Sequence, residues 1–590
     1  MDALWLLLIA GLGYVVAYHV YGRFLSRKIF GLRPEAKVPS EAKRDGVDYV
    51  PTRKGIIFGH HFTSIAGTGP IVGPAIGIIW GWLPALLWVT LGNIFIGAVH
   101  DLGSLVVSLR NEGRSVSEVA ARYINKRVRF IFFAIVFLTL LIVIAVFGVV
   151  IAVVFDRFPG SVPAVWLQIP IAIVLGRLIY RRGMNVTFAT VLAVAAMYLT
   201  IWLGSRLPFK MPEIAGMPAT GSWTILLLIY AWIASTLPVT TLLQPRDYIN
   251  AWQLFIMMAL LAVGAVVTSF GGGLPMVAPA VNLSPTGAPP LWPFLFITIA
   301  CGAVSGFHSL VASGTSPKQL SREPDSQFVG YGSMLLEGAL ATLVLICVGA
   351  GIAIAYTTVE GETLSGLPAW QHHYASWAAA SGLRAKLAAV VVGAANMMSQ
   401  IGVPTGVGTA LMGVFIASFA GTTLDTSVRI QRYVVGELAS DLKIPAMANR
   451  WTATTLAVIT AAVLAFATGA NGMGAMALWP LFGSANQLLA SLALLVVTLY
   501  LRKQGGYKYV VTAIPCLIML VVTNWAMIVN ERIFISQRQW LLAAIGGGVF
   551  LLALWMTVEA VIAFFGSRPG TEPADEIRGP IPSLRGSAQA

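Results

Sequence analysis

Long apolar segments, separated by short polar or basic connections, recur along almost the whole chain. A helix needs about 20 apolar residues to cross the hydrocarbon core of a bilayer. Segments of this kind lie near 3–24, 56–80, 82–109, 130–155, 164–181, 184–204, 222–243, 250–272, 291–316, 329–356, 451–469, 475–500, 509–529 and 540–565. Residues 385–425 add one span and a re-entrant piece, because Pro404 and nearby glycines allow a break. The pattern predicts an all-α polytopic membrane protein with about 15 transmembrane helices.

Composition supports the same class. Of 590 residues, 57% are hydrophobic and only 11% are charged, whereas soluble domains carry about 25% charged residues. A soluble enzyme, a nucleic-acid-binding protein and a disordered chain are therefore excluded. The net charge of +14 comes from basic residues in short loops, which is the positive-inside bias of a membrane protein. We expect membrane lipid and no nucleic acid as partner.

The basic loops also predict orientation, because they should face the cytoplasm. This places the N-terminus outside, on an uncleaved helix, and the C-terminus in the cytoplasm. The expected parts are a first helix with a basic loop (1–55), two repeat halves (56–290 and 291–508), C-terminal helices (509–565) and a disordered tail (566–590). Ser115 and Glu118 have the spacing of a capping box at the start of a short surface helix.

Two segments share the local pattern His-x5-Gly-Thr-[Gly/Ser]-Pro. One runs from His61 to Pro70 and the other from His308 to Pro317. The charge pattern makes them antiparallel, and inverted repeats with broken helices indicate the binding site of a secondary transporter. Freed backbone groups and half-helix N-termini at such breaks favour a carboxylate. The alternative, that Gly and Pro only kink helices for packing, is weaker for a doubled motif.

The residues expected to bind substrate lie at these two breaks. They are His60, His61, Gly67, Thr68, Gly69, His308, Ser309, Ser313, Gly314 and Thr315. Because His60 and His61 are adjacent, on a regular helix they point about 100° apart and only one of them faces a given cavity.

Four ionisable residues inside or at the end of spans are candidates for coupling transport to a proton or cation: His100, Asp101, Glu337 and Asp425. Each such group costs about 2.5–3.5 kcal/mol on insertion scales, so each suggests a function. Alternatives remain: His100 and Asp101 form a structural pair, Glu337 is a protonated packing residue, and Asp425 pairs with Arg429 at i, i+4. A metal site from His61 and His308 lacks supporting spacing, so we expect no metal and no cofactor.

Several long motifs resemble the carbon starvation protein A family of bacterial inner-membrane transporters. They are GHHFTSIAGTGPIVGP at 59–74, GAVHDL at 97–102, IACGAVSGFHSLVASGTSPK at 299–318, YGSMLLE at 331–337 and LWPLFGSANQ at 478–487. The resemblance covers about residues 3–530. It implies import of peptides or pyruvate during carbon starvation, proton coupling, and the LeuT-like core of amino-acid/polyamine/cation carriers, with inverted repeats and two broken helices. The chain departs from the family's pattern at His100 and before Asp425, where a glutamate is missing.

The preferred hypothesis is a secondary active transporter that works by alternating access and performs no covalent chemistry. It imports a small carboxylate-bearing nutrient with a proton or cation. A membrane-embedded hydrolase is disfavoured because the chain has no HExxH, GxSxG or CxxC motif. A nutrient sensor and a channel are further alternatives. A sensor is disfavoured because no soluble signalling domain is visible in the sequence.

Overall fold

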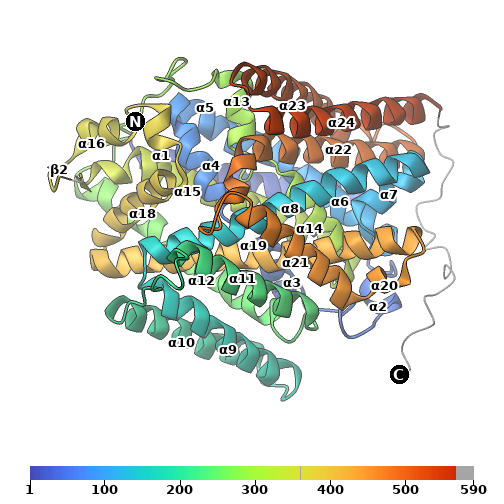
Figure 1. Cartoon of the computed structure of the whole chain (residues 1–590), viewed down its shortest axis with the longest axis horizontal. Helices are drawn as coiled ribbons and strands as arrows, with labels where there is room; N and C mark the ends of the chain where they lie inside the picture. Colours follow the sequence, from blue (N-terminus) through green and yellow to red (C-terminus); the bar gives the residue numbers. More distant parts are fainter. Residues whose placement is uncertain (359, 567–590) are drawn as a thin grey trace.

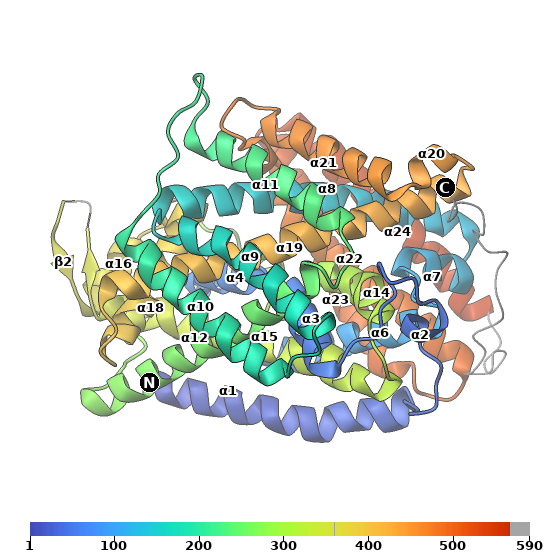
Figure 2. The same cartoon turned by 90° about the horizontal axis from the view of Figure 1, so that it is seen from below.

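The computed structural model describes residues 1–358 and 360–566, and most of them are helical. Helices are expected here because lipid offers no hydrogen-bond partners, so each apolar segment satisfies its backbone internally. The first helix, α1 (Ala3–Ala17), continues through π-helical turns to Ile29 and lies along one edge of the molecule (Figure 2). The predicted tail falls outside the described residues, apart from Gly566.

The number of spans is smaller than the predicted 15. Twelve helices of the described chain have the length and composition to cross a membrane, and the bent pair Lys54–Ala66 and Gly69–Trp80 raises this to 13. Predicted span 291–316 is split into two short helices. Predicted span 451–469 is a helix of only 17 residues, Arg450–Phe466. Residues 385–425 hold two helices that meet at Pro404, rather than one span with a re-entrant piece.

The two predicted halves present their elements in the same order. Each begins with a broken segment, α3 (Lys54–Ala66) and α4 (Gly69–Gly77) in the first half and α13 (Leu291–Thr298) and α14 (Gly306–Gly314) in the second. Next comes a helix that contains π-helical turns. These are Trp88–Gly97 before α6 (Ala98–Arg110), and Gln327–Gly332 before α15 (Ser333–Gly349).

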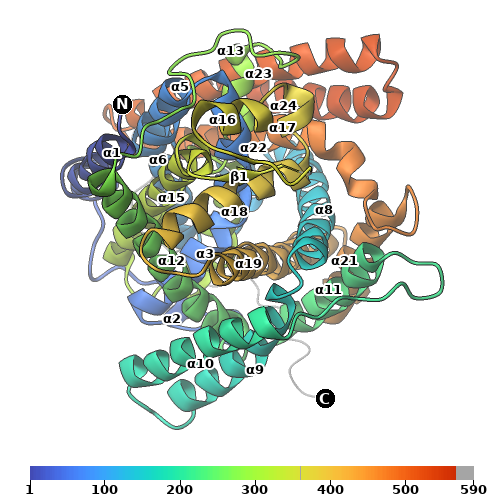
Figure 3. The same ribbon diagram turned by 90° about the vertical axis from the view of Figure 1, so that its left-hand side faces the viewer.

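A long helix follows in each half, and the two long helices pack against each other. They are α8 (Lys126–Arg157) and α19 (Thr405–Asp441). Helix α12 (Leu243–Gly271) packs on α3, and α22 (Trp479–Gln504) packs on α14. The helices α3, α4 and α14 are thus enclosed by helices from both halves, whereas α13 lies at the edge of the molecule (Figures 1 and 3).

The other elements surround this centre. The helices α9 (Ser161–Tyr180) and α10 (Val186–Arg206) form a hairpin that projects from the molecule (Figure 3). The remaining helices and strands are α2 (Pro39–Ala42), α5 (Trp82–Leu87), α7 (Val116–Tyr123), α11 (Ala219–Thr236), β1 (Tyr356–Thr357), β2 (Thr363–Leu364), α16 (Gly366–His373), α17 (Trp377–Ala380), α18 (Leu383–Ser399), α20 (Pro445–Ala448), α21 (Arg450–Phe466), α23 (Val510–Ser536) and α24 (Trp540–Gly566).

The capped surface helix predicted from Ser115 is confirmed. Helix α7 spans Val116–Tyr123, and the Ser115 side chain accepts a hydrogen bond from the backbone N–H of Glu118. The Ser115 hydroxyl in turn donates to Glu437 on α19 at 2.6 Å. The cap therefore also joins the first half of the chain to the second.

Candidate functional site

The first broken segment bends by 42° between α3 and α4. Gly67 has a positive φ of 31°, which side-chain-bearing residues rarely adopt. A Cβ added to Gly67 would lie 2.6 Å from Thr423 Oγ1 on α19. Backbone conformation and close packing both require glycine here.

The second broken segment is interrupted over a longer stretch, residues 299–305, between α13 and α14. Side chains from other elements satisfy the freed backbone. Asn93 Nδ2 donates to the Gly302 carbonyl at 2.9 Å, and the Gly302 N–H donates to Glu337 Oε1 at 2.9 Å. The break is held by polar side chains from the π-helical turns of the first half and from α15.

The two broken segments run antiparallel and contact each other along their length. His61 Nδ1 lies 2.7 Å from Ser316 Oγ. Further along the first segment, a Cβ at Gly69 would meet Cys301 Sγ at 2.3 Å, and one at Gly73 would meet the Thr298 carbonyl at 2.9 Å. Residues later in the first segment thus contact residues earlier in the second, which is the antiparallel arrangement that an inverted repeat requires.

Four of the predicted residues form one cluster beside the second break, here called the acid–histidine cluster: His100, Asp101, His308 and Glu337. Asp101 lies between two histidines, with Oδ1 2.7 Å from His100 Nδ1 and Oδ2 3.1 Å from His308 Nδ1. The other ring nitrogen, His308 Nε2, is 3.4 Å from Glu337 Oε2. All four side chains are fully buried.

A second buried cluster lies beside the first break and is here called the arginine-bearing cluster: His60, Tyr230, Arg246, Asp247 and Asp425. His60 Nδ1 is 2.5 Å from Asp247 Oδ2, and Arg246 Nη1 donates to Asp425 Oδ2 at 2.6 Å. Tyr230 donates to the same carboxylate oxygen at 3.1 Å and accepts from Arg246. His60 and His61 therefore face different neighbours, as adjacent positions on a helix should.

The hydroxyl groups predicted to bind substrate differ in their partners. Ser309 Oγ donates to the Gly306 carbonyl and Ser313 Oγ to the Ser309 carbonyl, both at 2.7 Å. Thr315 Oγ1 is buried and has no hydrogen-bond partner among the described residues. Thr68 is buried and caps α4 without a side-chain bond. Gly314 and Thr315 lie at the C-terminal end of α14, so the second break predicted at these residues is wrong: the segment is interrupted earlier, at residues 299–305.

The alternative in which Asp425 pairs with Arg429 is wrong. Asp425 bonds Arg246, while Arg429 Nη1 donates to Asp48 Oδ1 at 2.7 Å. Asp48 lies in the basic loop after α2 and also accepts from Arg432 at 2.8 Å. Burial would raise the pKa of the Asp48 carboxyl, but the guanidinium groups of Arg432 and Arg429 hold it well below its usual range.

Sequence reasoning missed Asn93, Arg246 and Asp247. Arg246 and Asp247 lie near the start of α12, where a charged pair before an apolar span looks like the end of a loop. Asn93 is a single polar residue in an apolar run, and nothing in that run predicts the π-helical turns that direct it to Gly302.

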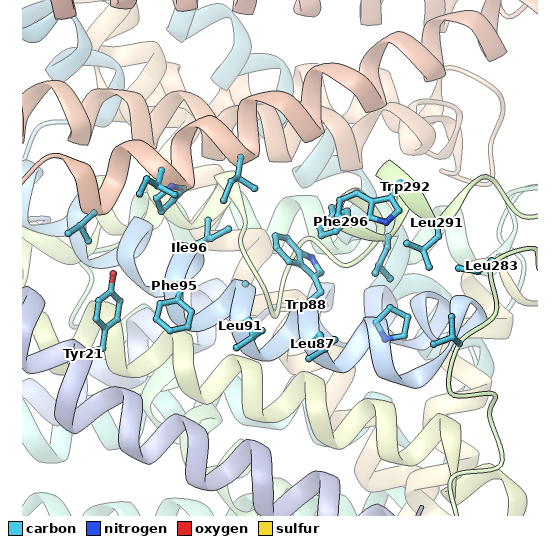
Figure 4. Close-up of a pocket in the computed structure, with 18 of the residues that line it drawn as sticks. Tyr21, Leu87, Trp88, Leu91, Phe95, Ile96, Leu283, Leu291, Trp292 and Phe296 are labelled. Atoms are coloured by element: carbon cyan, nitrogen blue, oxygen red, sulfur yellow. The ribbon is translucent and has the colours of Figure 1, made fainter.

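Of two cavities, one lies outside these clusters and the other borders the arginine-bearing cluster. One, of about 770 Å³, has a largely apolar lining that includes Trp88, Phe95 and Trp292 (Figure 4). Several of its lining side chains are exposed, so in a bilayer this face meets lipid. The other, of about 30 Å³, is lined by Gln168, Tyr230, Arg246 and Ser418 among others and has the volume of about one water molecule.

Many membrane-spanning helices, two antiparallel broken segments and buried ionisable groups at their contact define a polytopic membrane protein of the secondary-transporter class. Residues 2–526 match the family model described as carbon starvation protein CstA. The chain belongs to this family, and the family predicted from the motifs is confirmed.

Relatives with assigned names cover most of the chain. A protein of Campylobacter jejuni named peptide transporter CstA is 33% identical in an alignment of 562 residues. The alignment covers 89% of this chain and 79% of that protein. The pyruvate/proton symporter BtsT of Escherichia coli K12 is 31% identical over 596 residues, covering 89% of this chain and 81% of that protein. Among solved structures, a manganese transporter of Eremococcus coleocola matches at a TM-score of 0.49 with 11% identity, covering 89% of this chain and 99% of that one.

Proposed function

We propose that the protein is a proton-coupled importer of a small carboxylate-bearing nutrient, a peptide or pyruvate, in the inner (plasma) membrane. The acid–histidine cluster carries this proposal. In the described part of the chain, the ion pairs of Asp101 and Glu337 are with histidines and not with lysine or arginine. A buried carboxylate without a permanent cation needs a proton or another cation to offset its charge.

The proton path follows from the order of the groups. His308 Nδ1 faces Asp101, and the other ring nitrogen, Nε2, faces Glu337. A single proton, held by either His308 Nε2 or Glu337 Oε2, would form a hydrogen bond between these two atoms. Glu337 also holds the Gly302 N–H in the second break. A change in the protonation of Glu337 therefore alters a bond that shapes the break, which links proton binding to conformation.

The substrate carboxylate would bind at the first break, at Gly67, Thr68 and Gly69, where α4 begins. Gly314 and Thr315 lie at the C-terminal end of α14 and would contribute to binding through the Thr315 hydroxyl rather than through a helix N-terminus. Half-helix N-termini attract anions, and several buried polar atoms of the two broken segments lack hydrogen-bond partners in the described part of the chain, among them His61 Nε2, His308 Nε2 and Thr315 Oγ1. Transport would proceed by movement of residues 56–290 against 291–508, with the N-terminus outside and the C-terminus in the cytoplasm. The names of the relatives support peptide or pyruvate as substrate.

The test is uptake of labelled pyruvate, and separately of a labelled dipeptide, into proteoliposomes with and without an inward proton gradient. We expect one of the two to accumulate, and the gradient to increase its uptake. Pyruvate accumulation would assign a monocarboxylate symporter, and dipeptide accumulation a peptide importer. Uptake of neither, in vesicles that hold folded protein, would refute the proposal.

A further inference from the structure

Cys301 lies at the second break and adds a third kind of donor to the space beside His308 and Glu337. Its thiol, one imidazole nitrogen and one carboxylate oxygen lie within 4.8 Å of one another. His308 and Glu337 are fully buried, while Cys301 is partly exposed. The absence of a side chain at Gly69 makes room for this thiol, because a Cβ there would overlap Cys301 Sγ.

Two atoms in this group lack hydrogen-bond partners within the described chain, His308 Nε2 and Glu337 Oε2. Both are directed at the same space, 3.4 Å apart. Asp101 Oδ2 lies 3.1 Å from the opposite ring nitrogen, Nδ1. A carboxylate in this position fixes the tautomer that leaves Nε2 with a free lone pair, which is the usual outer support of a metal-binding histidine.

From this geometry we infer that Cys301, His308 and Glu337 form a binding site for Zn²⁺ or a similar soft divalent cation, and that the bound ion inhibits transport. One sulfur, one nitrogen and one oxygen ligand, with a fourth position left for water, is a normal set for zinc. Binding displaces the thiol proton to solvent, because a coordinated cysteine is deprotonated.

Inhibition follows from two effects of the ion. It would occupy the place of the coupling proton between His308 and Glu337. It would also join the second break, through Cys301 and His308, to α15, which carries Glu337. The metal binding stands by itself, whereas the inhibition rests on the proposed function.

The first experiment measures Zn²⁺ binding to purified full-length protein in detergent, by competition with a chromophoric chelator. We expect one high-affinity ion per chain, and X-ray absorption with one Zn–S distance of about 2.3 Å. Cys301→Ser should weaken binding by more than about tenfold, since even an outer partner of a ligand contributes about 10–100-fold. Cys347→Ser and Cys516→Ser are matched controls, because both thiols are buried elsewhere, and should bind as the wild type does.

Equal Zn²⁺ affinity in the wild type and Cys301→Ser would refute the proposed site. An equal loss of Zn²⁺ affinity in the Cys347→Ser and Cys516→Ser controls would refute it as well. Should Cys301→Ser fail to fold, Glu337→Gln provides the same binding measurement through a different ligand. The second experiment adds Zn²⁺ to proteoliposomes and compares each variant's uptake with its own rate in chelator-treated buffer. Zn²⁺ should inhibit the wild type and spare Cys301→Ser. Equal inhibition of both would overturn inhibition at this site, while absence of any uptake would refute the proposed function and leave the binding result intact.

Discussion

The two broken segments carry the same motif, yet the side chains that surround them are different. His60, beside the first break, joins a cluster that contains Arg246, a permanent cation paired with Asp425. His308, beside the second break, joins Asp101 and Glu337, whose ion pairs are with histidines. Arg246 balances one of the two carboxylates of the arginine-bearing cluster, whereas neither carboxylate of the acid–histidine cluster is paired with a permanent cation in the described part of the chain. The repeat thus provides two similar breaks, and residues outside the repeat give them different roles.

The largest effect is expected from removing one charge of the arginine-bearing cluster. Asp425→Leu leaves Arg246 buried without its carboxylate, and breaking a buried pair costs about 3–5 kcal/mol. We expect a strong loss of folded protein and of thermal stability in detergent. The double variant Arg246→Met/Asp425→Leu removes both charges and should recover most of the loss. A stable Asp425→Leu would show that this cluster does not depend on its ion pair.

Glu337→Gln tests whether the acid–histidine cluster couples transport to a proton. Glutamine keeps an acceptor for the Gly302 N–H but cannot exchange a proton, so folding should be nearly unchanged and gradient-driven uptake should fall. Coupling free energies of about 1–3 kcal/mol correspond to roughly 5–150-fold, and we expect a loss in this range. Counterflow exchange without a gradient is the control and should persist. Unchanged dependence of uptake on the gradient would remove Glu337 from the coupling role.

Much of this arrangement could be predicted from sequence, because apolar length and a doubled motif are local signals. The family, the helical membrane fold and the first break follow from such signals. The second break does not, because the motif predicts it at 314–317 and the structure has it at residues 299–305. The number of spans does not, because a sequence does not show that 291–316 separates into two short helices or that 451–469 is too short. The partners of Asp425 and Glu337 also could not be predicted, because Arg246 and Gly302 reach them only through tertiary packing.

Glycine substitutions at corresponding positions of the motif test whether the first break requires glycine more strictly than the end of α14 does. Gly67 has a positive φ and would place a Cβ 2.6 Å from Thr423 Oγ1, whereas a Cβ at Gly314 meets Ile430 at 3.3 Å. Gly67→Ala should therefore cost about 1–3 kcal/mol through overpacking and strain, and Gly314→Ala should stay within about 0.5 kcal/mol. Thermal unfolding in detergent measures both, and equal losses would contradict the difference.

A smaller effect is expected at Asp48, which accepts from Arg429 and Arg432 on α19, the helix that also carries Asp425. Because its pKa is lowered in the folded protein, its stabilising contribution is complete above the ordinary aspartate value near 3.9 and is lost only as pH falls toward the folded-state pKa. Asp48→Asn keeps the shape but removes the charge, so it should cost about 1 kcal/mol, equally at pH 6 and pH 8. Thermal unfolding at both pH values measures this cost. A cost that differed between pH 6 and pH 8 would mean that another group titrates in this contact. The ion pairs of Asp48 would then depend on pH, unlike the permanent pairs that distinguish this part of α19 from the acid–histidine cluster.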